Sequence, residues 1–259
     1  MKRLIALTRA PSPKMADCQL TFVARSAIDY RRAVRQHAEY CNVLREIGAE
    51  VHTLNASDEL ADCVFVEDTA VVLDDMAFVC RLGAESRRAE TAVIEAELRR
   101  YRPIERSDPP ATIEGGDVLA VGRTLLVGLS SRTNAAGIEA LARTARPFGY
   151  LVRAVPVHGC LHLKTACTAL PDETLLVNRD WIDLSVLSDF KHVSVPPTEP
   201  WGANVICAAG SVVAAAEHSE TAALIRSLGF DVRTVEIDEF AKAEGGVTCL
   251  SLLFSVGDP

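Results

Sequence analysis

The sequence has no two cysteines separated by two residues, no block of basic residues and no long apolar run. Its eight cysteines lie far apart, which excludes a zinc ribbon or a dense disulfide framework and indicates buried, reduced thiols. No apolar stretch approaches the roughly 18 residues that a membrane helix needs. The apolar segment Leu4 to Leu7 is too short for the core of a signal peptide. We therefore expect a cytoplasmic protein without membrane contact.

Basic residues are fewer than acidic ones and are scattered. The 27 lysines and arginines stand against 35 aspartates and glutamates, which gives a formal net charge of −8 and a pI near 5.3. Such a chain has no positive field to attract a polyanion, so we expect no nucleic-acid partner. The excess of carboxylates is compatible with a small cationic substrate.

One structural unit recurs five times along the 259 residues: two short strands joined by a tight turn, usually followed by a helix. The intervals between successive units are 47, 48, 41 and 42 residues, counted from Glu67, Glu114, His162, Ala203 and Gly245. A period of this length predicts a ring of repeated α/β units. An ordinary α/β sheet with hairpins is the alternative. In the first and third units we predict opening strands over 66–73 and 162–170.

The last unit, 247–254, has no second strand of its own. The opening segment 4–8 could supply that strand and would close the ring, which removes exposed sheet edges. Three of the predicted helices end at a glycine that is followed by a return strand, namely Gly48, Gly149 and Gly229. Glycine favours the left-handed conformation that ends a helix.

Three unit starts carry residues that suit a reaction centre. They are Glu114-Gly115-Gly116-Asp117, His162-Leu163-Lys164 and Glu244-Gly245-Gly246-Val247-Thr248-Cys249. In a ring these starts converge on the axis, where Cys249 could act as nucleophile, His162 as proton donor and Glu114 as the support of the imidazole. A cysteine in an apolar run is more often a core residue, and an isolated histidine more often structural. Papain-like and caspase-like signatures are absent, which disfavours a peptidase.

Acidic residues also occur in the apolar segment Asp62-Cys63-Val64-Phe65-Val66-Glu67-Asp68. Carboxylates in apolar surroundings need cationic partners. A planar guanidinium of a substrate would match paired carboxylate oxygens. An internal salt bridge with Arg81, Arg87 or Arg88 is an equally good interpretation of these residues.

Taken together, these segments resemble the dimethylarginine dimethylaminohydrolases, members of the guanidine-modifying superfamily with a five-bladed α/β propeller. The resemblance covers nearly the whole chain. Its most specific segments are 62–68 (DCVFVED), 81–88 (RLGAESRR), 114–117 (EGGD), 127–134 (VGLSSRTN), 161–164 (LHLK) and 245–249 (GGVTC). It implies a single catalytic domain over residues 1–259, an α/β propeller of pseudo-five-fold ββαβ-type repeats. It also implies a cysteine-dependent amidine hydrolase that needs no metal or other cofactor.

The resemblance implies a reaction and a set of site residues. Nω-methylated arginine, either asymmetric dimethylarginine or monomethylarginine, is hydrolysed to citrulline and an alkylamine through a covalent thiouronium intermediate. Cys249 attacks the guanidinium carbon, His162 protonates the leaving amine and Glu114 supports the histidine. The implied substrate contacts are Asp68 and Glu67 at the guanidinium, Asp62 and the backbone of Leu20 at the amino-acid end, Arg87 and Arg132 at the α-carboxylate, and Thr248 beside the nucleophile.

One difference from a related family narrows the range of expected substrates. Arginine deiminases share the scaffold but carry an acidic residue two places after the histidine, where this chain has Lys164. Loss of that carboxylate leaves room for an alkylated nitrogen and favours methylarginine. The alternatives are a guanidine deiminase or amidinotransferase on the same scaffold, and a non-catalytic propeller that binds a partner. The methyl preference and the oligomeric state stay open.

Overall fold

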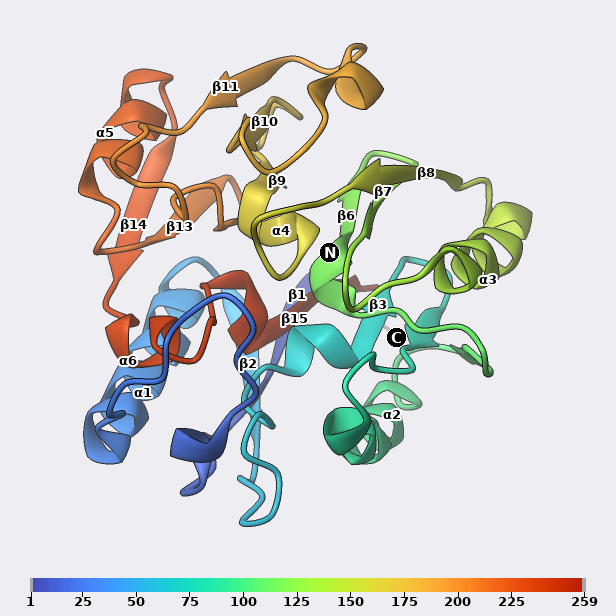
Figure 1. Ribbon diagram of the computed structural model, residues 1–259, viewed down its shortest axis with the longest axis horizontal. Coiled ribbons are helices and arrows are strands. Elements are labelled where there is room, and N and C mark those ends of the chain that lie inside the picture. Colours follow the sequence, from blue (N-terminus) through green and yellow to red (C-terminus); the bar gives the residue numbers. More distant parts are fainter. Residues whose placement is uncertain (1, 258–259) are drawn as a thin grey trace.

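The computed structural model describes residues 2–257, whose strands form five three-stranded sheets arranged around a common centre (Figure 1). Residues 1 and 258–259 of the predicted domain lie outside the described part. The strands are β1 (Arg3–Arg9), β2 (Ala49–Leu54), β3 (Ala70–Val72), β4 (Ala77–Val79), β5 (Ile104–Arg106), β6 (Val118–Val121), β7 (Thr124–Leu129), β8 (Leu151–Pro156), β9 (Cys167–Ala169), β10 (Leu175–Val177), β11 (His192–Ser194), β12 (Val205–Ala208), β13 (Ser211–Ala215), β14 (Asp231–Val235) and β15 (Ser251–Val256).

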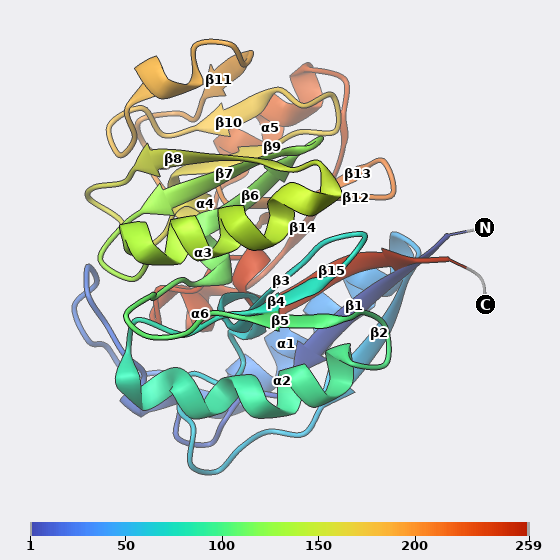
Figure 2. The ribbon, with the colours of Figure 1, turned by 90° about the vertical axis from the view of Figure 1, so that its right-hand side faces the viewer.

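The helices lie mainly at the periphery of the ring (Figures 1 and 2). The α-helices are α1 (Tyr30–Glu46), α2 (Thr91–Leu98), α3 (Ala135–Ala145), α4 (Leu163–Ala166), α5 (Ser219–Ser227) and α6 (Asp238–Ala241). The 3₁₀ helices are η1 (Met15–Asp17), η2 (Val66–Thr69), η3 (Glu85–Glu90), η4 (Gly115–Asp117), η5 (Arg146–Phe148), η6 (Leu184–Leu187) and η7 (Thr248–Leu250). No helix within residues 2–257 has both the length and the apolarity to span a bilayer.

All five sheets share one topology. In each, the middle strand pairs antiparallel with one neighbour and parallel with the other, as β4 does with β3 and β5. The antiparallel outer strands of neighbouring sheets contact one another, for example β6 with β9 and β9 with β12. We call each sheet and its helix a blade. The predicted five-bladed α/β propeller is thus confirmed.

The ring is closed by the pairing of strands from opposite ends of the sequence. β1 occupies the middle of its sheet, antiparallel to β15, with Ile5 opposite Phe254 and Thr8 opposite Ser251. The same strand runs parallel to β2. Figure 2 shows β1 and β15 side by side. The predicted role of the opening segment as partner of the last strand is therefore confirmed.

Local signals explain where the long helices begin and end. The Asp29 side chain accepts a hydrogen bond from the backbone N–H of Arg32, and Asn134 does the same for Gly137, so both act as N-caps. Gly48, Gly149 and Gly229 have φ values of +93°, +80° and +93°. This left-handed conformation costs glycine little, and it ends the helix as the sequence predicted.

The starts of the blades differ from the prediction. The opening strands predicted over 66–73 and 162–170 begin later, at Ala70 and Cys167, because a helical turn precedes each of them. Similar turns precede β6 and β15. A single turn is too short to show a helical periodicity, so the apolar alternation of the following strand hides it. These turns place backbone and side chains around the axis.

The closing strand should carry much of the stability of the ring. The Phe254 side chain is buried against Tyr101, with ring centroids 5.2 Å apart, and belongs to the apolar cluster beneath α2. We expect Phe254→Ala to lower the free energy of unfolding by about 3 to 4 kcal/mol, since it empties a large buried volume. Urea denaturation followed by circular dichroism measures this. Leu151→Ala, at a side chain that is 60% exposed on β8, is the control and should cost less than about 0.5 kcal/mol. Equal losses in both variants would contradict the prediction.

Candidate active site

The helical turns at the blade starts bring the predicted reacting residues to one place. Glu114 directly precedes η4 and His162 directly precedes α4, so these two side chains occupy the same position in consecutive blades. Asp68 lies in η2, and Cys249 lies in η7. Near the axis, η2 contacts η4 and η7, and η4 also contacts α4. Residues far apart in the sequence therefore line one small pocket.

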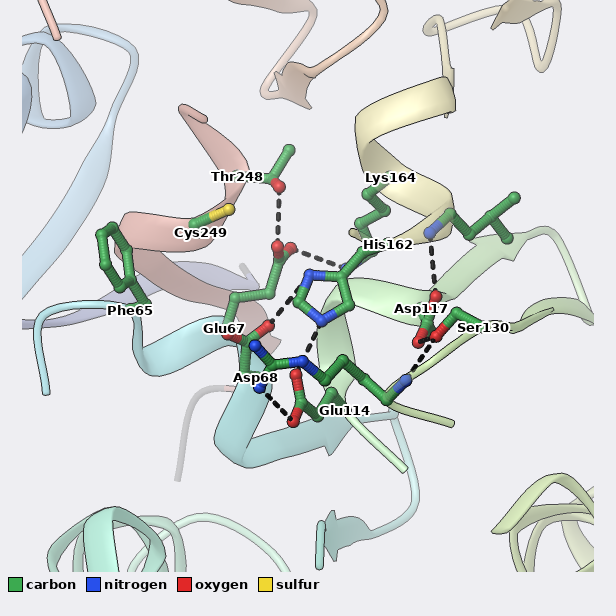
Figure 3. Close-up of polar contacts among 12 residues, drawn as sticks. Phe65, Glu67, Asp68, Glu114, Asp117, Ser130, His162, Lys164, Thr248 and Cys249 are labelled. Atoms are coloured by element: carbon green, nitrogen blue, oxygen red, sulfur yellow. Dashed lines mark hydrogen bonds and ion pairs between the residues drawn. The ribbon is translucent and has the colours of Figure 1, made fainter. Parts of the chain in front are cut away.

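His162 is held between two carboxylates (Figure 3). Its Nε2 lies 2.7 Å from Glu114 Oε2, and its Nδ1 lies 3.7 Å from Asp68 Oδ1. Burial alone would lower the pKa of His162, but the charge of Asp68 and the hydrogen bond to Glu114 outweigh it and raise that pKa above 6.5. Burial would raise the pKa of Glu114, yet the hydrogen bond and charge of His162 lower it. The pair is therefore an imidazolium and a carboxylate at neutral pH.

Only one of the two carboxylate oxygens of Asp68 accepts a hydrogen bond from the described residues. Arg87 Nη1 donates to its Oδ2 at 2.8 Å, and Arg87 also contacts Glu90 and the Phe65 carbonyl. The internal salt bridge considered for this acidic segment thus exists, with Arg87 as the cation. Within the described residues, however, Asp68 Oδ1 has no hydrogen-bond partner. A buried carboxylate oxygen without a donor favours a ligand that supplies one.

Cys249 is buried at the edge of the same pocket. Its sulfur points toward the side of the site that holds Glu67 and His162 (Figure 3). The Gly246 N–H donates to the sulfur at 3.3 Å. Burial, together with the negative charges of Glu67 and Asp68, raises the pKa of the thiol well above 9.0. Cys249 is therefore a neutral thiol until a positive charge arrives beside it.

Two glycines permit the close approach of the reacting groups. A Cβ atom at Gly116 would lie 2.6 Å from His162 Nδ1 and 2.8 Å from Asp68 Oδ1. A Cβ at Gly246 would overlap Asn204, whose side chain binds both the N–H and the hydroxyl of Thr248. The glycine pairs noted in the sequence are thus explained by space near the axis.

Glu67 lies at the bottom of the pocket, and both of its carboxylate oxygens already accept hydrogen bonds from the protein. Lys164 Nζ donates to its Oε1 at 2.7 Å, and the Thr248 hydroxyl donates to its Oε2 at 2.6 Å. On the far side of this contact, a cavity of about 280 Å³ runs between the central strands. The Glu67 and Lys164 pair separates that cavity from the site.

The segment 17–26, which we call the lid, covers the pocket. The Gln19 N–H donates to both oxygens of Asp62, at 3.1 and 3.2 Å, and Arg132 Nη2 donates to the Thr21 hydroxyl at 3.3 Å. Leu20 between them is half-buried. The remaining space is about 10 Å³, which holds at most about one water molecule. The structure is therefore a closed form, and a substrate must displace the lid to enter.

One group could in principle hold a metal ion. Asp68, Glu114 and His162 bring ligand atoms within 4.8 Å of one another. The carboxylates already share positive charge with Arg87, Arg132 and the protonated imidazole. A metal would have to displace the proton of His162, which these same carboxylates stabilise. The donor set suits proton transfer better than metal binding.

Sequence reasoning missed several residues that support the site. Asp117 accepts from the Leu163 N–H at 2.9 Å and from the Ser130 hydroxyl at 2.7 Å, which fixes the turn that carries His162. Glu90 forms the second salt bridge of Arg87. Asp117 belongs to the quoted segment EGGD, so its position could have been noted. Glu90 has no comparable signal, because it lies in an ordinary polar helical segment.

Comparison with known proteins agrees with the geometry of this pocket. A family model described as N,N dimethylarginine dimethylhydrolase, eukaryotic, matches residues 17–183. An N(G),N(G)-dimethylarginine dimethylaminohydrolase of Streptomyces coelicolor is 42% identical, over 95% of this chain and 95% of that protein. The chain belongs to the dimethylarginine dimethylaminohydrolase family. A dimethylarginine dimethylaminohydrolase of Pseudomonas aeruginosa is 34% identical over 98% of this chain and 99% of that protein.

Solved structures extend the comparison. A dimethylarginine dimethylaminohydrolase from Pseudomonas aeruginosa, a cysteine-to-serine mutant complexed with citrulline, aligns with a TM-score of 0.91 and 32% identity, over 98% of this chain and 100% of that one. The N-terminal domain of a cyanobacterial arginine dihydrolase aligns with a TM-score of 0.86 but only 19% identity, over 98% of each chain. That second likeness shows the shared propeller and nothing about the substrate.

The charge state of His162 can be tested by titration. Glu114→Gln removes a negative charge at 2.7 Å, so we expect the pKa of His162 to fall in this variant, as measured by NMR of the imidazole against pH. In the wild type the raised pKa stabilises the fold fully below pH 6.5, and this contribution is lost as the pH rises through the raised value.

The stability of the variant should therefore depend less on pH in that range. Glu236→Gln, at an exposed carboxylate paired with Arg32, is the matched control and should leave the titration of His162 unchanged. An unaltered pKa of His162 in Glu114→Gln would show that this carboxylate does not hold the proton in place.

Proposed function

We propose that this protein hydrolyses Nω-methylated arginine to citrulline and an alkylamine through a covalent intermediate on Cys249. The observation that carries the proposal is the buried pocket in which a thiol, an imidazolium and the unpaired oxygen of Asp68 meet. Membership of the family supports the same reaction. The domain over 1–259 is proposed to act as one catalytic unit.

Each polar part of the substrate has a complementary group in the pocket. Asp68 Oδ1 accepts hydrogen bonds from the guanidinium. Arg132 binds the α-carboxylate through Nη1, which has no hydrogen-bond partner among the described residues. Arg87 adds positive charge to the same wall. Asp62 and the backbone of Leu20 in the lid meet the amino-acid end, whereas Glu67 and Thr248 support the floor beneath the guanidinium.

The substrate itself activates the nucleophile. The thiol of Cys249 is neutral because burial and nearby carboxylates raise its pKa. A guanidinium cation placed against Asp68 supplies the missing positive charge next to the sulfur, and so lowers the pKa of the thiol. The thiolate forms only when substrate is present, which protects the residue from other electrophiles.

The two half-reactions use His162 first as an acid and then as a base. The thiolate attacks the guanidinium carbon, and the imidazolium gives its proton to the alkylated nitrogen as the C–N bond breaks. An alkylamine leaves, and a thiouronium remains on Cys249. Neutral His162 then takes one proton from the attacking water. As the C–S bond breaks, the second water proton goes to the sulfur, so citrulline is released and Cys249 returns to the neutral thiol. Glu114 stabilises the imidazolium that exists before and after these steps.

The preference for a methylated nitrogen follows from the floor of the pocket. Both oxygens of Glu67 are taken by Lys164 and Thr248, so Asp68 offers the one free carboxylate oxygen at the guanidinium among the described residues of the pocket. Because only Asp68 binds the guanidinium, the guanidinium nitrogen on the opposite side has no charged partner. That nitrogen can carry methyl groups, which is the difference expected from an arginine deiminase.

The remaining expectations about partners stay predictions from the sequence. With a net charge of −8, the protein suits a small cationic amino acid as its ligand and not nucleic acid. We also propose that it acts in the cytoplasm.

Product analysis tests the reaction. We expect citrulline from asymmetric dimethylarginine and monomethylarginine, slower release from arginine, and little turnover of agmatine, which lacks the α-carboxylate that Arg132 binds. Cys249→Ser should lower turnover by about 10³-fold or more, because the hydroxyl is not activated in the same way. Cys207→Ser, outside the pocket, is the control. Arginine turned over as fast as the methylated substrates would reassign the chain to a deiminase.

Selective alkylation separates an enzyme from a silent binding protein. A chloroacetamidine carries an amidinium cation and should label Cys249 much faster than neutral iodoacetamide does, since only the cation lowers the thiol pKa. His162→Gly should still be labelled but should not turn over, because the leaving amine loses its proton source. His158→Gly, at an exposed histidine, is the control. Equal rates with both reagents would argue against activation by substrate charge.

A further inference from the structure

Glu244 holds the lid by an arrangement that no other site residue shares within the described residues. Its Oε1 accepts from three consecutive backbone N–H groups of the lid, those of Thr21 at 2.9 Å, of Phe22, and of Val23 at 2.6 Å. Three successive N–H groups form a nest for one anionic oxygen. This carboxylate therefore keeps the lid in the closed position.

The backbone of Glu244 is unusual as well. Its φ is +61°, in the left-handed region that residues with a Cβ seldom adopt. Glycines follow at positions 245 and 246, yet the strained position itself is a glutamate. Strain of this kind persists where the surrounding structure imposes it, often at a binding site.

Three buried polar atoms of the pocket have no hydrogen-bond partner among the described residues. They are Asp68 Oδ1, Arg132 Nη1 and Glu244 Oε2, and all three residues line the same pocket. The nearest charged groups are not hydrogen-bonded to the first two: His162 Nδ1 lies 3.7 Å from Asp68 Oδ1, and Glu114 Oε1 lies 3.6 Å from Arg132 Nη1. The set comprises two acceptors and one donor, as an α-amino acid with a guanidinium side chain requires.

The side chains that carry two of these atoms, Arg132 Nη1 and Glu244 Oε2, meet at one residue of the lid. Thr21 contacts Glu244 through its N–H and Arg132 through its hydroxyl, so the two side chains converge on one residue. The groups on one α-carbon, an ammonium and a carboxylate, need an acceptor and a donor this close together. Asp62 holds Gln19, two residues away, and completes the acidic side of this corner.

We propose that Glu244 is a specificity-determining residue: its Oε2 binds the α-ammonium group of the substrate while its Oε1 holds the lid closed. This inference rests on the proposed function, because it takes the ligand to be an arginine derivative. One carboxylate then links recognition of an amino acid to closure of the pocket. Guanidinium compounds without an α-ammonium group leave Oε2 buried and unpaired, which disfavours the closed form.

The test compares Glu244→Gln on two substrates. The amide keeps an oxygen for the three lid N–H groups but replaces the acceptor at the ammonium with a donor. For monomethylarginine we expect KM to rise about 10- to 100-fold, the range for a hydrogen bond to a charged group, with kcat within about threefold of wild type. For the analogue that lacks only the α-amino group, 5-(N′-methylguanidino)pentanoate, we expect no change in KM.

Two further variants separate recognition from lid closure. Glu244→Gly removes both oxygens and should raise KM for both substrates, because the lid is released. Glu217→Gln, at an exposed acid near Glu244, should behave as the wild type. Equal rises of KM for both substrates in Glu244→Gln would reduce the residue to a lid contact, and no rise for either would remove it from recognition; both results overturn the proposal.

A direct binding measurement distinguishes this inference from the proposed function. Calorimetry on Cys249→Ser, with and without Glu244→Gln, measures affinity for monomethylarginine and for the analogue without chemistry. If the wild type fails to turn over methylarginine, the proposed function falls. The difference in affinity between the two ligands still decides the role of Glu244. If the double variant loses this difference, ammonium binding by Glu244 is supported. If the difference persists in the double variant, ammonium binding by Glu244 is contradicted.

Discussion

The contact between His162 Nε2 and Glu114 Oε2, 2.7 Å long, joins two consecutive blades at the centre of the ring. Two charged groups are stable there only as a pair, because burial disfavours each alone. Their pairing fixes the imidazole, keeps it protonated and sets the distance between the helical turns. The propeller places the same structural position of each blade at the axis, so repetition of the fold brings the imidazole and its carboxylate partner together.

Around this pair, the described part of the pocket holds more carboxylates than cations. Asp68 and Glu90 share the single charge of Arg87, and Lys164 pairs with Glu67, whereas Asp68 Oδ1 and Glu244 Oε2 have no hydrogen-bond partner among the described residues. In the binding mode proposed above, the guanidinium and the ammonium of the substrate lie against these two oxygens. The same excess of negative charge contributes to the raised pKa of the Cys249 thiol.

Much of this could be predicted from the sequence, because it depends on local signals. The period of the units and the glycines at helix ends predicted the ring. The Cys, His and Glu near the unit starts predicted that these three residues meet at its axis. The single helical turns were not predictable, since one turn has no periodicity. The sequence also did not predict the contact of Glu244 with the lid. The EGG segment of Glu244 matches Glu114 in sequence but not in position, because Glu114 directly precedes η4 whereas Val247, three residues after Glu244, directly precedes η7.

The pairing of β1 with β15 has a consequence for how the chain folds. Thr8 pairs with Ser251, which lies 243 positions later in the sequence. During synthesis, one edge of β1 therefore has no partner strand until Ser251 and its neighbours have been made. Contacts of such long range form slowly. The turn that carries Cys249 directly precedes β15, so the pairing of the two ends of the described chain also fixes the position of the thiol.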